Sequence, residues 1–329
     1  MSTGPTTFDN PKAGRERRLT ADEHHLPRTY SVSHRTTYTY EEYVTDSYGR
    51  ALLSPRATDS QEIISNEVEV TPEPHLLEEH TDHFGNHSHY IEIRSPHSRL
   101  VVAKKSLVRV EWPRVDEDAL NQWTVESAVA ALADPRADID PVERAQYLLP
   151  SQLVEFGSIV REYAETILPP ERPLGEALVA LFHEIYTGFA YKKGATSVKT
   201  TLPELLEKRA GVCQDYAHLA IGCLRSVGLP ARYVSGYIET APPPGKPKLA
   251  GSDATHAWTS VMVPGGAPGQ DGPGWVDLDP TNDHFADSRY IVTGWGRDYR
   301  DVTPLKGIIF SEGSGSKLDV AVDVIRQPD

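Results

Sequence analysis

Cysteine is scarce in this chain of 329 residues, which contains only Cys213 and Cys223. If both lie on one helix, a rise of ~1.5 Å per residue places them about 15 Å apart. That separation is well beyond the ~7 Å between Cα atoms that a disulfide tolerates. Two cysteines also fall short of the ligand set of a zinc ribbon. We therefore expect neither a structural disulfide nor a cysteine-based metal centre.

Long apolar runs and excess basic charge are also missing. Because no stretch of 18 apolar residues occurs, we expect no membrane-spanning helix. The 33 basic and 47 acidic residues give a formal net charge of −14, which disfavours nucleic acid and anionic membranes as partners. Residues 1–28 are polar and charged, without the apolar centre of a signal peptide. The expected location is therefore cytoplasmic.

The first third of the chain has the composition of short β-strands. Residues 1–28 lack periodicity and are expected to form a disordered or extended leader. Residues 29–112 are rich in β-branched and aromatic residues, and turn signals separate their apolar segments. This pattern predicts an N-terminal antiparallel β-sandwich or barrel. Residues 113–140 are expected to be a connector with a short helix around Asn121–Ala133.

The remaining residues, 141–329, are expected to form one catalytic domain in which helices precede strands, so the predicted fold class is α+β. A helix beginning near Gly211 is predicted to end at Gly228 and Pro230. The tail is predicted to contain two weak strands, 308–310 and 318–324. The other helices are expected at 141–147, 154–167, 174–186 and 202–209, and the other strands at 231–238, 256–263 and 275–279.

Cys213 is predicted to lie at the start of that helix, directly after Gly211 and Val212. Unpaired backbone N–H groups and the helix dipole favour an anion at this position, and therefore the reactive thiolate. The simpler alternative is an ordinary buried thiol, since free cysteine is often fully buried. Cys223 suits that inert role better, because it lies mid-helix on the apolar face.

Two further residue types complete a candidate triad. His256 opens a predicted strand, in which alternation places it on one face with Trp258. Asp277 and Asp279 share a face of another strand, which Pro280 ends. Taken alone, a strand histidine is more often structural and an aspartate before proline is usually a turn residue. Together, a thiol, an imidazole and a carboxylate match the nucleophile, the base and the group that orients the base.

The chain resembles the transglutaminase-like superfamily in its bacterial branch. The segments that carry the resemblance read Gly-Val-Cys-Gln-Asp-Tyr-Ala-His from Gly211, Thr-His-Ala-Trp from Thr255 and Gly-Trp-Val-Asp-Leu-Asp-Pro-Thr from Gly274. The family places its catalytic aspartate before Pro-Thr, which selects Asp279 over Asp277. The resemblance implies a Cys213–His256–Asp279 triad and a papain-like core, whose nucleophile helix packs on an antiparallel sheet. It implies no cofactor.

The resemblance extends to the bacterial transglutaminase-like N-terminal domain, through residues 30–40, 52–61 with Pro55-Arg56, and 82–86. We expect this domain to supply no catalytic group; shaping of substrate access and self-association into a homo-oligomer are its open roles. Within the core, the Cys213 backbone N–H is the first expected oxyanion donor. Tyr191 is the candidate side-chain donor, although a buried core tyrosine is an equal alternative.

The histidines of the first domain cluster at His80, His83, His87 and His89, and a metal site is the less favoured explanation. For the whole protein, the sequence favours a cysteine protease or amidase that hydrolyses a peptide or isopeptide bond through a thioester. A protein-glutamine transglutaminase, with an amine as acceptor, is the alternative because the same triad serves both reactions. An inactive protein-binding member of the family is the alternative of another class. The expected partner is a peptide or protein substrate.

Overall fold

The structure is a computed structural model that describes residues 22–240, 255–267, 269–311, 313 and 315–328. Most of the predicted leader lies outside these residues, as do residues 241–254. At the start of the described chain, Asp22–His25 form a 3-10 turn, and the first strand follows from Arg28. No helix among the described residues is long and apolar enough to cross a membrane.

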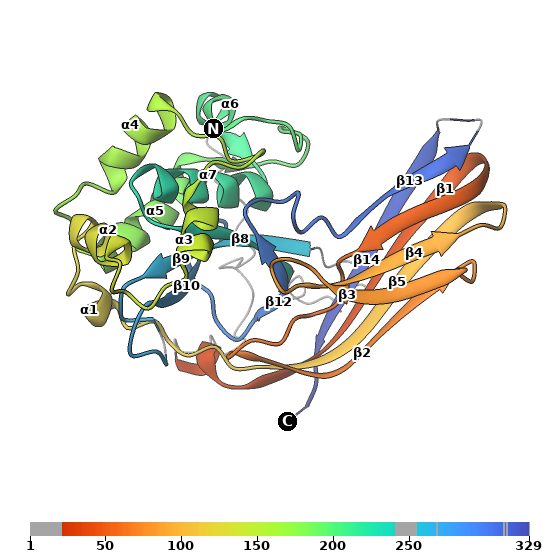
Figure 1. Ribbon diagram of the computed structural model, residues 1–329, viewed down its shortest axis with the longest axis horizontal. Helices are drawn as coiled ribbons and strands as arrows, with labels where there is room; N and C mark the ends of the chain where they lie inside the picture. The colour runs from red at the N-terminus through yellow and green to blue at the C-terminus, as the bar shows by residue number, and fades with distance from the viewer. Residues whose placement is uncertain (1–21, 241–254, 268, 312, 314, 329) are drawn as a thin grey trace, which may run out of the picture.

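The N-terminal domain is a single curled antiparallel sheet built around one long strand, β1 (Arg28–Ala51) (Figure 1). The strand order is β2-β5-β1-β4-β3, and the inward residues of β1, among them Tyr30 and Val32, are fully buried. Alternation of apolar residues therefore produced the predicted antiparallel β domain. The other strands are β2 (Gln61–Thr71), β3 (Leu76–Thr81), β4 (His87–Ile93) and β5 (His97–Val110).

The C-terminal tail completes this sheet, which differs from the predicted division of the chain. The tail strands β13 (Leu305–Ser311) and β14 (Ser316–Arg326) pair antiparallel with β1, not with the catalytic core. Val322 and Val324 are buried there in one cluster with Tyr30. The predicted C-terminal domain, 141–329, therefore includes two strands that belong to the sheet of the N-terminal domain. The reason is physical: a short alternating strand does not encode which distant strand will complete its hydrogen bonds.

The second domain, the core, packs helices against a five-stranded antiparallel sheet in the order β11-β10-β9-β8-β12. The short helix predicted around Asn121–Ala133 corresponds to α2, and one further short helix, α1, precedes the predicted range. The helices are α1 (Glu117–Leu120), α2 (Val125–Ala133), α3 (Pro141–Leu148), α4 (Ser158–Ile167), α5 (Leu174–Gly188), α6 (Leu202–Lys208) and α7 (Cys213–Ser226). The sheet strands are β8 (Ala231–Ile238), β9 (Thr255–Val263), β10 (Gly274–Asp279), β11 (His284–Phe285) and β12 (Tyr290–Gly296).

Helix α7 is the centre of this core and is surrounded by α4, α5, α6 and the sheet (Figure 1). Almost all of its residues from Asp215 to Ser226 are buried. Thr259 on β9 donates a hydrogen bond to the Ala217 carbonyl at 3.2 Å, which ties the helix to the sheet. A Cβ at Gly222 would lie 2.4 Å from Leu202, so only glycine allows α6 to approach this closely. The predicted α+β class and the helix-on-sheet core are thus confirmed.

Candidate active site

Cys213 is the first residue of α7, as the sequence predicted. The Asp215 carboxylate accepts the Val212 N–H at 2.8 Å and the Thr196 hydroxyl at 2.6 Å, which fixes the helix start. A Cβ at Gly211 would lie 2.8 Å from the Asp215 carboxylate, so glycine is needed beside this cap. The Cys213 side chain is partly exposed at this helix start. It is therefore accessible to a substrate.

The second cysteine has the opposite environment. Cys223 is fully buried in the core, and burial raises the pKa of its thiol. A thiol that stays protonated and cannot be reached by solvent is a poor nucleophile. The two cysteines therefore differ in solvent access, as their places on the helix predicted, and burial keeps the Cys223 thiol protonated.

His256 lies at the start of β9 and connects the thiol to a carboxylate. Its Nε2 donates to Oδ2 of Asp279 at 2.7 Å, and its imidazole also hydrogen-bonds the Cys213 side chain. Because Asp279 occupies Nε2, Nδ1 is the ring nitrogen left for the sulfur. The three residues come from α7, β9 and the end of β10, so the fold brings together side chains 43 and 23 positions apart in the sequence.

Asp279 is fully buried, and several donors hold its charge. Besides His256 it accepts the Thr281 N–H at 2.7 Å, the Asn282 side-chain amide at 2.7 Å and the Tyr290 hydroxyl at 2.6 Å. Burial would raise its pKa, but the charge and hydrogen bond of His256 and the other donors lower it well below its usual range. The carboxylate therefore stays ionised inside the protein.

The pKa of His256 moves the other way. Burial lowers it, but the Asp279 charge and the hydrogen bonds to Asp279 and Cys213 outweigh burial and raise the pKa to about 10. The imidazole is thus expected to be protonated at neutral pH, with the carboxylate on one side and the thiol on the other. A protonated imidazole beside a sulfur favours the thiolate.

Asp277 shares a strand face with Asp279 but has another role. It accepts the Trp258 indole N–H at 2.8 Å and the Ser260 hydroxyl at 3.2 Å. The Trp258 ring in turn stacks on His256, with ring centroids 6.1 Å apart and planes at 26°. Alternation left both aspartates open, and the structure places Asp279 at the imidazole and Asp277 behind the tryptophan.

Tyr191, the candidate oxyanion donor, lies beside the nucleophile. It ends the short strand β6 (Ala190–Tyr191), which pairs in parallel with β7 (Ala210–Gly211) just before the helix. Its hydroxyl hydrogen-bonds the side chain and backbone N–H of Cys213, and burial together with the Cys213 charge raises its pKa. The phenol thus keeps its proton, which an oxyanion donor requires.

Sequence reasoning missed Tyr290 and Asn282, both of which donate to Asp279. Asn282 follows the Asp-Pro-Thr segment by one residue, which is a usable signal for a local contact. Tyr290 lies on β12, a strand that was not predicted, and its contact with Asp279 arises only when β12 joins the sheet. No local pattern could have identified it.

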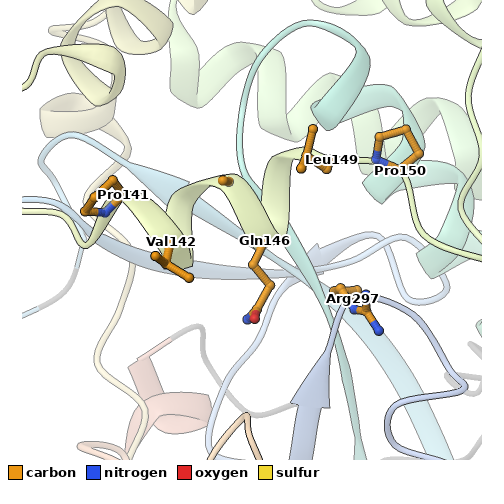
Figure 2. A pocket seen from close by; sticks show the side chains of 7 residues that line it. Pro141, Val142, Gln146, Leu149, Pro150 and Arg297 are labelled. Carbon is orange, nitrogen blue, oxygen red and sulfur yellow. The ribbon is translucent and has the colours of Figure 1, made fainter.

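The histidine cluster of the first domain lies outside this constellation. His80 bonds Ser88 at 2.9 Å, His87 bonds Glu79 at 2.9 Å, and His83 bonds Gln146. Within the part of the chain that the structure describes, no group of three metal-ligating side chains occurs. An open hollow of about 510 Å³ on α3 is also separate from the triad (Figure 2). It is lined by Pro141, Val142, Ala145, Gln146, Leu149, Pro150 and Arg297.

Known proteins resemble this chain along most of its length. A protein described as uncharacterised from Mycobacterium tuberculosis is 43% identical over 303 residues, which are 90% of this chain and 92% of the relative. A crystal structure of a candidate cysteine protease from Cytophaga hutchinsonii shares the fold, with a TM-score of 0.72 at 20% identity over 92% of each chain. A protein-glutamine gamma-glutamyltransferase from Pseudomonas aeruginosa is 31% identical over 106 residues, 32% of this chain and 15% of that protein.

The family patterns divide the chain as the architecture does. The bacterial transglutaminase-like N-terminal region matches residues 30–109, which contain the first five strands of the curled sheet. The transglutaminase-like superfamily matches residues 161–280, which contain Cys213, His256 and Asp279. The chain belongs to the transglutaminase-like superfamily and carries that superfamily's bacterial N-terminal region.

Proposed function

We propose that this protein is a cysteine protease or amidase that hydrolyses a peptide or isopeptide bond through a thioester intermediate. One observation carries the proposal: His256 hydrogen-bonds the buried Asp279 carboxylate on one side and the Cys213 side chain on the other. In this arrangement the thiol is the nucleophile, the imidazole carries the proton and the carboxylate orients the imidazole. The formal net charge of −14 disfavours nucleic acid and anionic membranes as partners, and the proposed substrate is a peptide or protein in the cytoplasm.

In the first half of the reaction, the Cys213 thiolate attacks the carbonyl carbon of the amide, and the carbonyl electrons move to oxygen. The backbone N–H of Cys213 and the Tyr191 hydroxyl are close enough together to donate to that oxyanion. When the C–N bond breaks, the His256 imidazolium gives its proton to the leaving amine. The products are a thioester on Cys213 and a free amine.

In the second half, the neutral imidazole of His256 takes a proton from water as the water oxygen attacks the thioester carbon. The C–S bond then breaks, a carboxylic acid leaves, and the Cys213 thiolate and the imidazolium re-form. Throughout, Asp279 holds Nε2 and thereby keeps Nδ1 directed at the sulfur and the substrate. The carboxylate stays ionised in both halves.

Reaction with iodoacetamide followed by mapping of the labelled peptide tests the nucleophile. We expect rapid labelling of Cys213 in the folded protein and its loss in His256→Ala. A peptide library with quenched fluorophores then tests hydrolysis. Unreactive Cys213 in the folded wild type would overturn the enzymatic proposal and favour an inactive protein-binding member of the family.

Transamidation is the second candidate, because the P. aeruginosa relative, which is 31% identical over 106 residues, is a protein-glutamine gamma-glutamyltransferase. The thioester is common to both reactions, and they differ in whether an amine or water attacks it. Incubation with a glutamine-containing protein and a fluorescent primary amine distinguishes them. Amine incorporation that exceeds hydrolysis would make transamidation the principal activity.

A further inference from the structure

Strand β12 ends the five-stranded sheet of the core, so only one of its edges pairs with another strand of that sheet, β8. The N–H and C=O groups on an open edge need other partners when they are buried. The pairing of β12 with β8 also slips between Val292 and Gly294, which changes the spacing of the outward groups. The partners of these groups come from the N-terminal domain.

Two side-chain amides from that domain act as substitutes for a neighbouring strand. The Gln61 amide accepts the Val292 N–H at 2.8 Å and donates to the Val292 carbonyl at 2.8 Å. The Asn86 amide accepts the Trp295 N–H at 3.0 Å and donates to the Trp295 carbonyl at 2.8 Å. Each amide thus forms the paired hydrogen bonds that a strand residue would form.

A third contact fixes the start of the strand. The indole N–H of Trp112, the last residue assigned by sequence to the β domain, donates to the Tyr290 carbonyl at 3.1 Å. Gln61 and Asn86 are buried at 3% and 0% exposure, so water cannot replace their bonds cheaply. The backbone position of β12 therefore depends on the N-terminal domain.

The same strand carries the side chain that holds the triad carboxylate. The Tyr290 hydroxyl donates at 2.6 Å to Oδ2 of Asp279, the oxygen that His256 also bonds. The Tyr290 ring is fully buried and meets the Trp258 ring edge to face at 5.2 Å. Hence a shift of β12 would move this hydroxyl and loosen the carboxylate.

We propose that the N-terminal domain positions the catalytic carboxylate through β12: Gln61, Asn86 and Trp112 fix the strand, and Tyr290 holds Asp279 for His256. Tyr290 and the amides are positioning residues, since none of them touches the reacting atoms. The inference rests on the proposed thiol chemistry of Cys213. It gives the N-terminal domain a role in activity although that domain contributes no group to the triad.

The test is the pH dependence of Cys213 alkylation by iodoacetamide in the full-length chain. Tyr290→Phe removes one hydroxyl. Gln61→Met removes, at similar volume, the two amide hydrogen bonds to Val292 and a third one to the Arg56 carbonyl. With the carboxylate loosened, the imidazolium is less stable and the thiolate forms only at higher pH. We expect the acid limb of the rate profile to move to higher pH in both variants. Near neutral pH the rate should fall about fivefold in Tyr290→Phe and less in Gln61→Met.

Tyr237→Phe is the matched control, because Tyr237 is a buried tyrosine of the adjacent strand β8 that bonds His34 at 2.9 Å. It should leave both rate and profile unchanged, and thermal unfolding identifies which variants are folded. Unchanged profiles in folded Tyr290→Phe and Gln61→Met, or an equal shift in Tyr237→Phe, would overturn the inference. An unreactive wild-type Cys213 would instead refute the proposed function.

Discussion

Replacing Asp279 by asparagine should damage the site far more than the same replacement at Asp277. Oδ1 of Asp279 accepts the Thr281 N–H, whereas Oδ2 accepts His256, Asn282 and Tyr290. An asparagine amide fits the same space, but its NH₂ group would face a donor in either orientation. The buried imidazolium would also lose its counter-charge.

The magnitude follows from the pKa of His256. Burial lowers this pKa, yet the Asp279 charge and hydrogen bond help raise it to about 10. Without Asp279 the pKa should fall towards its ordinary ~6.5, which corresponds to ~5 kcal/mol of imidazolium stabilisation at most. The corresponding change in a serine protease triad lowers turnover about 10⁴-fold. Because the helix start also favours the thiolate, we expect a loss of roughly 10²- to 10³-fold.

The assay is the alkylation rate of Cys213 between about pH 5 and pH 10, which needs no known substrate. Asp277→Asn keeps an oxygen for the Trp258 indole, so the stack on His256 survives and the rate should change less than about fivefold. Thermal unfolding confirms that both variants are folded. If Asp277→Asn were the more damaging of two folded variants, the assignment of Asp279 as the residue that orients His256 would be wrong.

Three further outcomes are expected. Iodoacetamide at neutral pH should label Cys213 much faster than the buried Cys223, and preferential labelling of Cys223 would contradict the assignment of the nucleophile. Alanine at His83 or His87 should leave the alkylation rate nearly unchanged, whereas a loss as large as that from removing the triad histidine would refute this. Lys104 is fully buried, its Nζ has no hydrogen-bond partner among the residues that the structure describes, and burial lowers its pKa to about 7. The unfolded chain binds the proton of this ammonium group more tightly than the folded protein does. Lys104→Met should therefore stabilise the protein most below about pH 7, by at least ~1 kcal/mol, and the gain should shrink towards pH 10.5. Urea unfolding at several pH values measures this gain, and a gain that grows with pH would refute the prediction.

The sequence predicted those features that depend on neighbouring residues. Alternating apolar residues predicted the strands of the N-terminal domain, and a glycine before a helical pattern placed Cys213 at a helix start. The order of the Cys, His and Asp motifs, compared with the family, selected residues that the fold then brings within hydrogen-bonding contact. Each of these signals lies within a few residues of the feature it predicts.

Tertiary structure alone decided which distant groups meet. Alternation places Asp277 and Asp279 on one face, and their roles are separated by the tertiary contacts of His256 with Asp279 and of Trp258 with Asp277. Likewise, the Gln61 amide completes an edge of β12 although Gln61 and Val292 are 231 positions apart. The tail strands join β1 across an even longer separation in the sequence. Such contacts depend on which buried N–H, C=O and carboxylate groups still lack partners once the sheets have packed, and local sequence does not record this.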